Sequence, residues 1–388
     1  MRSHWPTVRR WILPVLPLAL AWSLYAPVLD FGLVYDDHDA IEANTAVTSC
    51  DLLALWTTPF WGRGEADRVA TWRPLTSLTF AVERQIGLLI GHWSDGAATP
   101  QPAITGDHKA IAIALHAGNL FALLATIAAL WWLLSTLGGN LGVRLTATVL
   151  FAVHPLLTEA VAFTVARADL QSACLGMLFL GAWIRGWPIR AAFFFAGALW
   201  TKESAVVLPA IALAWSWSAA RMPDATTPER QVVRRQWIGA ACVLCLWFAA
   251  RIAVLGSLTG APATVVENPV VAADAVGRLL AALIVAGLAG PRLLFSTEWS
   301  SDYGLAHFPT IAAGSTAAVG WLVWCTLGVG LWLARWRSPR IVLWVAAIAA
   351  PLLLFSHLLT PLPTAFAERV WVLPTAATGI RRQFEPLG

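Results

Sequence analysis

The run WILPVLPLALAWSLYAPVL, residues 11–29, contains no charged residue, and the acidic segment VYDDHD, residues 34–39, follows soon after it. About 20 apolar residues are needed to cross a membrane as a helix. Three arginines precede the run, and it leads to Tyr25 and Pro27 instead of to the small residues of a cleavage site. The sequence therefore predicts a retained first membrane span, with an acidic pair in water just beyond it.

The rest of the chain has the same apolar character. Of its 388 residues, 58% are hydrophobic and only 12% are charged, about half the charged fraction of roughly 25% found in soluble domains. A chain this apolar cannot cover a globule with polar side chains, so we expect lipid around it. Its arginines lie between apolar runs, which favours a role in membrane orientation over nucleic-acid binding, and no nucleic-acid partner is expected.

Further apolar runs predict a bundle of spans. They lie at 109–135, 144–163, 168–185, 189–202, 204–220, 237–255, 313–334 and 341–359, with another apolar stretch at 275–295. The arginine groups that separate them mark alternate loops as cytoplasmic; they are Arg2/Arg9/Arg10, Arg144, Arg185/Arg190, Arg221/Arg230/Arg234/Arg235 and Arg335/Arg337/Arg340.

This alternation places 30–108 and 256–312 in the periplasm. It requires the 275–295 stretch to enter and leave on one side or to lie in the interface. We expect residues 1–378 to form one all-α polytopic membrane domain, followed by a short polar tail, 379–388.

The acidic pair Asp36-Asp37 is the first candidate for chemistry. Adjacent carboxylates point in different directions, so they suit two roles, and like-charge proximity can raise the pKa of one and make it a better base. A solvated turn after a helix is the alternative, and on the dipeptide alone it is the commoner case. Asp36, Asp37 and Asp39 could also hold a divalent cation, but no metal cofactor is expected.

Other ionisable residues lie beside or within the apolar runs, where such groups are costly and point to function. These candidates are His154, Glu159, Arg167, Asp169, Lys202 and Glu203. A further candidate, Arg73, lies in the same loop as the acidic pair, with a headgroup anchor as the alternative reading. An arginine suits a pair of phosphate oxygens, and a lysine binds phosphate as a point charge. In the simpler reading, Glu159 and Asp169 neutralise Arg167, and Lys202 and Glu203 compensate each other. No nucleotide-binding motif is present, which favours a lipid-borne substrate.

Several short motifs together resemble the TMTC family, the transmembrane and TPR-containing protein O-mannosyltransferases. Their order and spacing cover nearly the whole chain. The motifs include Tyr35-Asp36-Asp37, Phe60-Trp61-Gly62, Arg73-Pro74-Leu75-Thr76, His154-Pro155, Ala166-Arg167-Ala168-Asp169-Leu170, Lys202-Glu203-Ser204 and Glu368-Arg369-Val370-Trp371. The chain departs from the family at Trp72, where a tyrosine is usual, and at Pro59, where an aspartate is common.

The resemblance implies a GT-C type glycosyltransferase fold whose periplasmic first loop carries short juxtamembrane helices. It implies a polyprenyl-phosphate sugar donor, usually carrying mannose, and a protein or glycolipid acceptor. Asp36 or Asp37 would deprotonate the acceptor hydroxyl, and transfer would invert the anomeric carbon. The phosphate-stabilising candidates carried over from the family are Arg73, Arg167, Lys202 and Arg369.

The expected location is a bacterial inner membrane with the site facing the periplasm. No TPR repeats follow within the sequence, which removes the family's usual acceptor-presenting module. The competing class is a non-enzymatic membrane protein, either a transporter or a degenerate assembly partner. A transporter should carry polar residues at mid-bilayer in paired broken helices. Here the ionisable residues lie mostly near one face, which favours an interfacial enzyme.

Overall fold

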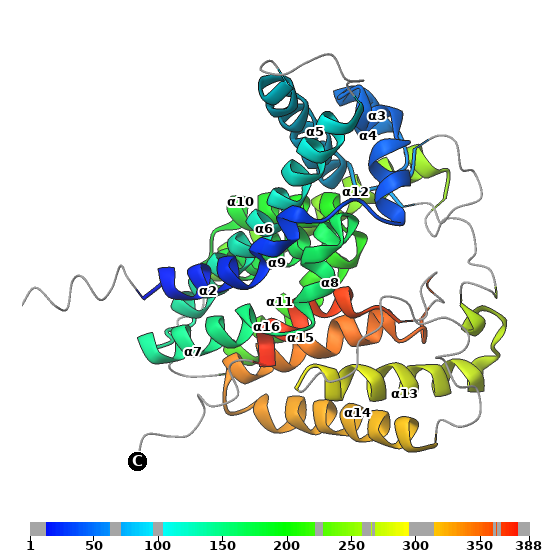
Figure 1. The fold of residues 1–388 in the computed structure, drawn as a ribbon. Coiled ribbons are helices and arrows are strands. Elements are labelled where there is room, and N and C mark those ends of the chain that lie inside the picture. Colours follow the sequence, from blue (N-terminus) through cyan, green and yellow to red (C-terminus); the bar gives the residue numbers. More distant parts are fainter. Residues whose placement is uncertain are drawn as a thin grey trace, which may run out of the picture.

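The computed structural model describes residues 13–62, 71–95, 104–221, 228–257, 265, 268–294, 314–359, 362 and 366–378, without the side chains of 92–95 and 104–107. Within these ranges every regular element is a helix, as Figure 1 shows. Four helical stretches are long and apolar enough to cross a membrane: His108–Thr136, Arg230–Leu255, Ala275–Arg292 and Gly314–Ala334. The prediction of an all-α polytopic membrane protein is confirmed.

The helices follow most of the apolar runs closely. They are α2 (Val15–Tyr25), extended by η1 (Ala26–Asp30), α6 (Ile104–Thr136), α7 (Leu141–Ala152), α9 (Arg167–Ile184), α10 (Pro188–Thr201), α11 (Leu208–Ala219), α12 (Arg230–Leu255), α13 (Ala275–Arg292), α14 (Gly314–Ala334) and α15 (Pro339–Phe355). One large apolar core joins buried residues of α2, α6, α7, α9 to α12, α15 and α16 (Val372–Thr378), and a separate cluster joins α13 to α15.

The predicted span 144–163 is wrong as a continuous helix. Helix α7 ends at Ala152, and α8 (Leu157–Ala162) and η3 (Thr164–Ala166) follow as separate elements. The break falls at His154-Pro155, because the residue before a proline is disfavoured in the α conformation. A second break separates α10 from α11, where Lys202 is extended (φ −155°, ψ 134°) and η4 (Glu203–Val207) follows.

The arginine groups whose side chains are described gather at one end of the bundle. Arg144 donates to Ser135 Oγ (2.8 Å), and Arg185 donates to Thr136 Oγ1 (3.1 Å), both at the end of α6. Arg221 lies over the ring of Trp336 at 5.4 Å, between Arg335 and Arg337 in the sequence. These contacts support the predicted pattern of alternate loops on one side.

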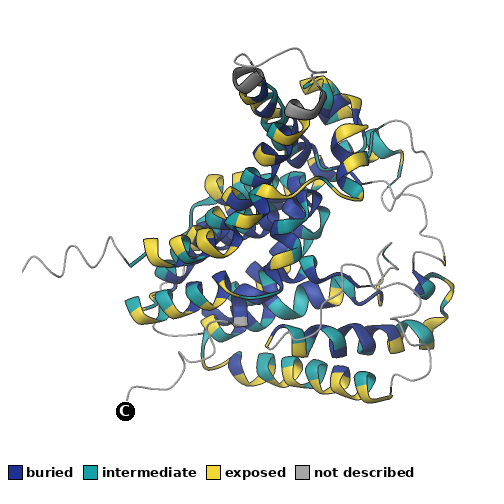
Figure 2. Cartoon of the chain, in the orientation of Figure 1, coloured by how far each residue is buried: buried dark blue, intermediate teal, exposed yellow. Residues whose placement is uncertain are grey.

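The first loop is more helical than expected. It contains η2 (His38–Glu42), α3 (Thr45–Thr48), α4 (Leu52–Thr57) and α5 (Pro74–Asp95). Helix α5 has 22 residues, longer than the expected short juxtamembrane helices, and it packs along the first part of α6 (Figure 1). Helix α5 exposes the apolar side chains of Val82, Ile86, Leu89 and Ile90, and Figure 2 shows exposed stretches along this helix.

Helices α13 and α14 approach each other through glycines. A Cβ added at Gly287 would overlap the carbonyl oxygen of Thr316, and one added at Gly320 would overlap that of Leu283. Small residues allow this close backbone approach between membrane helices. Both flanks of α13 contact the segment after α15: Asn268 donates to the Leu362 carbonyl (2.6 Å), and Arg292 lies 3.5 Å from Glu368. Of the predicted 256–312 region the structure describes 256–257, 265 and 268–294, and the predicted 379–388 tail lies outside the described residues.

Candidate functional site

The two adjacent aspartates have different environments. Asp37 is fully buried. Its Oδ1 accepts a hydrogen bond from the Val165 backbone N–H (2.9 Å), and its Oδ2 accepts one from Val34 (3.2 Å). Burial raises the pKa of Asp37, although these backbone hydrogen bonds oppose the shift. Asp37 therefore fastens the first loop to η3.

Asp36 is only partly buried, and no hydrogen bond or ion pair engages its carboxylate within the described ranges. The guanidinium of Arg73 is close enough for an electrostatic interaction with it. The preceding residue, Tyr35, has φ 47° and is 82% exposed. A left-handed backbone is uncommon for a non-glycine residue, and such positions cluster at functional sites. Asp36 is thus the available carboxylate of the pair.

Three ion pairs connect separate segments of the chain near the acidic pair. Arg73 donates from Nε (3.0 Å) and Nη2 (2.7 Å) to the two carboxylate oxygens of Glu203. The Lys202 ammonium lies 2.5 Å from Asp169. The first pair joins the first loop to the break between α10 and α11. The second pair joins the same break to α9.

The third pair joins α8 to η6 (Glu368–Trp371). Glu159 accepts from Arg369 Nη1 (2.7 Å) and from its backbone N–H (2.9 Å). Electrostatic interactions of Lys202 with both Arg73 and Arg369 show that the three pairs form one cluster. The structure therefore brings together most of the residues that the sequence predicts, although they come from distant parts of the chain.

The charge of this cluster extends to an arginine that the sequence analysis did not select. Arg251 is buried on α12 and interacts electrostatically with Glu203 and Arg73. The signal was present, since Arg251 is an arginine inside an otherwise apolar span. Burial raises the pKa of Glu203, but the charges and hydrogen bonds of Arg73, with the charge of Arg251, outweigh it and lower that pKa to about 2. Glu203 is therefore a carboxylate held by arginines.

Arg167 is engaged differently. Its side chain is fully buried, and it donates to Asn119 Oδ1 (2.7 Å), to the Leu115 carbonyl and to the Glu83 carboxylate. The simpler expectation that Glu159 and Asp169 neutralise Arg167 is wrong, because those carboxylates pair with Arg369 and Lys202. Glu83, on α5, was missed because its partner lies 84 residues further along the chain.

His154 lies at the break between α7 and α8. Its Nε2 is 3.3 Å from the Leu293 carbonyl, and its Nδ1 accepts from the Leu156 backbone N–H (3.3 Å). These contacts hold the break against the end of α13. In the part of the chain that the structure describes, no group of three or more His, Cys, Asp or Glu side chains is arranged to hold a metal ion.

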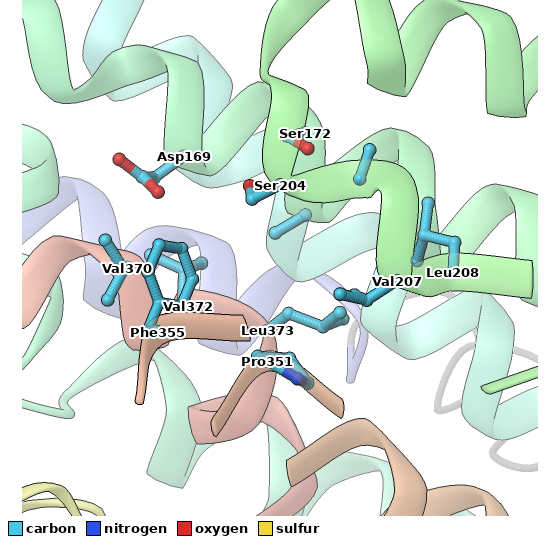
Figure 3. Close-up of a pocket in the computed structure, with 12 residues that line it drawn as sticks. Asp169, Ser172, Ser204, Val207, Leu208, Pro351, Phe355, Val370, Val372 and Leu373 are labelled. Carbon is cyan, nitrogen blue, oxygen red and sulfur yellow. The ribbon is translucent and has the colours of Figure 1, made fainter. Parts of the chain in front are cut away.

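A small cavity (Figure 3) is lined in part by Asp169, the partner of Lys202. Its polar end is formed by Asp169, Ser172 and Ser204, and α15 and the 370–373 segment supply much of its apolar wall, including Phe355 and Leu373. The cavity has a volume of about 30 Å³, enough for about two water molecules. The charged cluster therefore borders a space that is polar at one end and apolar at the other.

Comparison with known proteins finds similarity to protein O-mannosyl-transferases. The chain is 38% identical to protein O-mannosyl-transferase Tmtc1 of Drosophila melanogaster over 163 residues, which is 41% of this chain and 16% of that relative. It is 35% identical to TMTC4 of Mus musculus over 167 residues, 40% of this chain and 21% of the relative.

A third relative, F38B6.6 of Caenorhabditis elegans, is 26% identical over 216 residues, 53% of this chain and 28% of the relative. The matched part of the chain thus spans less than a third of the length of each of these proteins. No protein-family model and no solved structure matches the chain. The similarity to TMTC proteins, predicted from the motifs, is confirmed.

Proposed function

We propose that this TMTC-like chain is a GT-C type membrane glycosyltransferase that uses a polyprenyl-phosphate sugar. The sugar would be mannose or another hexose, and the acceptor a hydroxyl group on a protein or glycolipid. The relatives named above are protein O-mannosyl-transferases, which supports glycosyl transfer and a protein acceptor. The observation that carries the proposal is the unengaged Asp36 carboxylate next to a cluster of cations.

In this proposal Asp36 is the general base. Its carboxylate takes the proton from the acceptor hydroxyl while the hydroxyl oxygen attacks the anomeric carbon of the sugar. The bond from that carbon to the phosphate oxygen breaks, and the phosphate leaves with the electron pair, still attached to its lipid. Attack opposite the leaving phosphate inverts the anomeric carbon. A positioned base contributes roughly 10²–10⁴ in rate.

Asp37 is a positioning residue. Its buried carboxylate holds the loop before the pair to η3 through the backbone N–H groups of Val34 and Val165. That attachment fixes the chain on which Asp36 stands. The sequence leaves open which aspartate acts, and the difference in what the two carboxylates contact supports Asp36 as the base.

The cations would stabilise the leaving phosphate. Negative charge grows on that phosphate in the transition state, and preorganised donors act most strongly where charge develops. Arg73, Lys202 and Arg369 lie in one cluster beside a cavity with an apolar wall, which suits a phosphate on a lipid chain. Arg167 is assigned a structural role, because its donors are taken by Asn119, Leu115 and Glu83.

In this proposal the site lies on the side of the membrane opposite the arginine-rich loops. Cytoplasmic loops carry an excess of arginine and lysine, and the ion-pair cluster lies on elements outside those loops. In a bacterial inner membrane this side is the periplasm. Soluble nucleotide sugars are scarce there, which agrees with a sugar that arrives on a lipid.

Donor specificity tests this proposal. Purified protein in lipid nanodiscs is given radiolabelled mannose either on a polyprenyl phosphate or on a soluble nucleotide, together with membrane acceptors. We expect label to be transferred from the polyprenyl phosphate alone. Transfer from the nucleotide alone, or consumption of neither donor, would overturn the proposed function.

A further inference from the structure

The Lys202–Asp169 pair has fewer hydrogen bonds than either of the other two ion pairs. Glu203 receives two hydrogen bonds from Arg73, and Glu159 receives two from Arg369. Asp169 receives one, from Lys202 Nζ. The ammonium makes no other hydrogen bond within the described ranges, although it has three donors. This contact can therefore be exchanged with less loss than either arginine pair.

Lys202 also lies close to two other positive charges. It is buried, and the charges of Arg73 and Arg369 both act on it. A buried ammonium between two guanidinium groups needs an anion next to it, because an unpaired buried charge is costly. Asp169 supplies that anion in the structure.

Asp169 also lines the cavity. The hydroxyl-bearing residues Ser172 and Ser204 lie at the same end of the cavity, and neither hydroxyl has a hydrogen-bond partner among the described residues. Figure 3 shows the Asp169 carboxylate on the rim of this space, with Val370, Phe355 and Leu373 along the other wall. The apolar walls suit a lipid chain, whereas the Asp169 carboxylate would repel an anionic head group for as long as it stays at the polar end.

We propose that Asp169 is an exchangeable counter-ion. It holds Lys202 while the site is empty, and the phosphate of the polyprenyl carrier takes its place when the carrier enters the cavity. Exchange of one anion for another keeps the buried ammonium neutralised throughout. It also removes the carboxylate from the cavity wall, which enlarges a space that is too small for the head group. This inference rests on the proposed function, since it concerns the same donor.

Farnesyl phosphate tests the exchange, with farnesol as the uncharged probe. Affinity and melting temperature are measured in nanodiscs. Wild type should prefer farnesyl phosphate to farnesol, and Lys202→Met should lose that preference. Without ligand, Asp169→Asn should melt at a lower temperature than wild type. It should bind farnesyl phosphate about tenfold more tightly, since a charged hydrogen bond no longer competes with the ligand. Farnesyl phosphate should therefore raise the melting temperature of this variant by more than it raises that of wild type.

Asp51→Asn is the control, because it removes the same charge from an aspartate that caps α4 and pairs with none of the three cations. It should not tighten binding. If Asp169→Asn binds farnesyl phosphate no better than wild type, or cannot be recovered folded even at saturating farnesyl phosphate, Asp169 is a fixed structural partner and the exchange is refuted. If wild type does not distinguish farnesyl phosphate from farnesol, the polyprenyl-phosphate site itself fails, and the proposed function fails with it.

Discussion

At the scale of single residues, Asp36 and Asp37 show how two identical neighbours acquire different roles. The Asp37 carboxylate accepts two backbone hydrogen bonds, whereas the Asp36 carboxylate interacts electrostatically with Arg73. The sequence predicted the pair as a candidate site from its position after the first span. It could not separate the two aspartates, because the partner of Asp37 is the backbone of Val165, 128 residues away.

Asp37→Asn tests the positioning role. The amide retains one oxygen, so either the buried N–H of Val165 or the more exposed N–H of Val34 loses its acceptor. Loss at the buried Val165 would cost about 1–3 kcal/mol. Thermal melts in detergent should show this loss. Asp51→Asn is the matched control, since Asp51 also accepts two backbone N–H bonds, at the exposed start of α4. Asparagine caps a helix as well as aspartate does, so equal losses in the two variants would contradict a special role for Asp37.

The lowered pKa of Glu203 predicts that the folded protein loses stability in acid. Its folded-state pKa, about 2, lies below the ordinary value of 4.5, because Arg73 and Arg251 outweigh the effect of burial. A group with a lowered folded-state pKa contributes stability above its unfolded pKa, and this contribution is lost as pH falls toward the folded value. Wild type should therefore lose more stability than Glu203→Gln between about pH 4.5 and pH 2. Parallel stability curves for the two proteins would refute this assignment.

At the scale of elements, the helix breaks assemble the site. The breaks between α7 and α8 and between α10 and α11 turn the chain next to Glu159 and Lys202. The sequence predicted the spans well, since apolar runs are long and unmistakable. The sequence analysis predicted one span over 144–163 because apolarity continues through Pro155, whereas the structure interrupts the helix between Ala152 and Leu157.

The ion-pair partners could not be read from the sequence. Arg73 and Glu203 lie 130 residues apart, and Glu159 and Arg369 lie 210 apart. Helix length and composition do not determine which helix ends meet. Asp169 and Lys202 lie only 33 residues apart across the α9–α10 hairpin. The simpler sequence reading nevertheless paired Lys202 with Glu203, which is wrong because Glu203 pairs with Arg73.

The close contact between α13 and α14 predicts that adding one methyl group at a contact glycine destabilises the fold. Gly320→Ala would drive a Cβ into the backbone of α13, and such overpacking costs about 1–3 kcal/mol. Gly328→Ala, on the same helix, meets nothing within 4 Å and should be neutral or stabilising by up to about 1 kcal/mol. Thermal melts in detergent compare the two variants. Equal effects would show that the close approach of α13 and α14 is absent.

At the scale of the whole molecule, positive charge and ion pairs separate to opposite ends of the bundle. The described arginine contacts connect the ends of α6, α11 and α14, and the acidic pair and its cations lie on the elements facing the other way. The sequence predicted this polarity from the spacing of arginines alone.

Accessible cysteines test the orientation. Leu53→Cys on α4 and Arg337→Cys before α15 both introduce exposed side chains, in a protein where Cys50 is replaced by serine. A membrane-impermeant thiol reagent added outside intact spheroplasts should label the first position, and label the second only after the membrane is opened. Labelling of both positions from one side would contradict the assigned topology.

The central claim is that Asp36 is the base of a glycosyl transfer from a polyprenyl phosphate. Single-turnover transfer from polyprenyl-phosphate mannose, measured for wild type, Asp36→Asn and Asp37→Asn at matched amounts of folded protein, tests it most directly. We predict that Asp36→Asn lowers the rate by about 10²–10⁴ without changing the melting temperature, and that Asp37→Asn lowers the rate less and the melting temperature more. An Asp36→Asn protein that transfers mannose at the wild-type rate would contradict the claim.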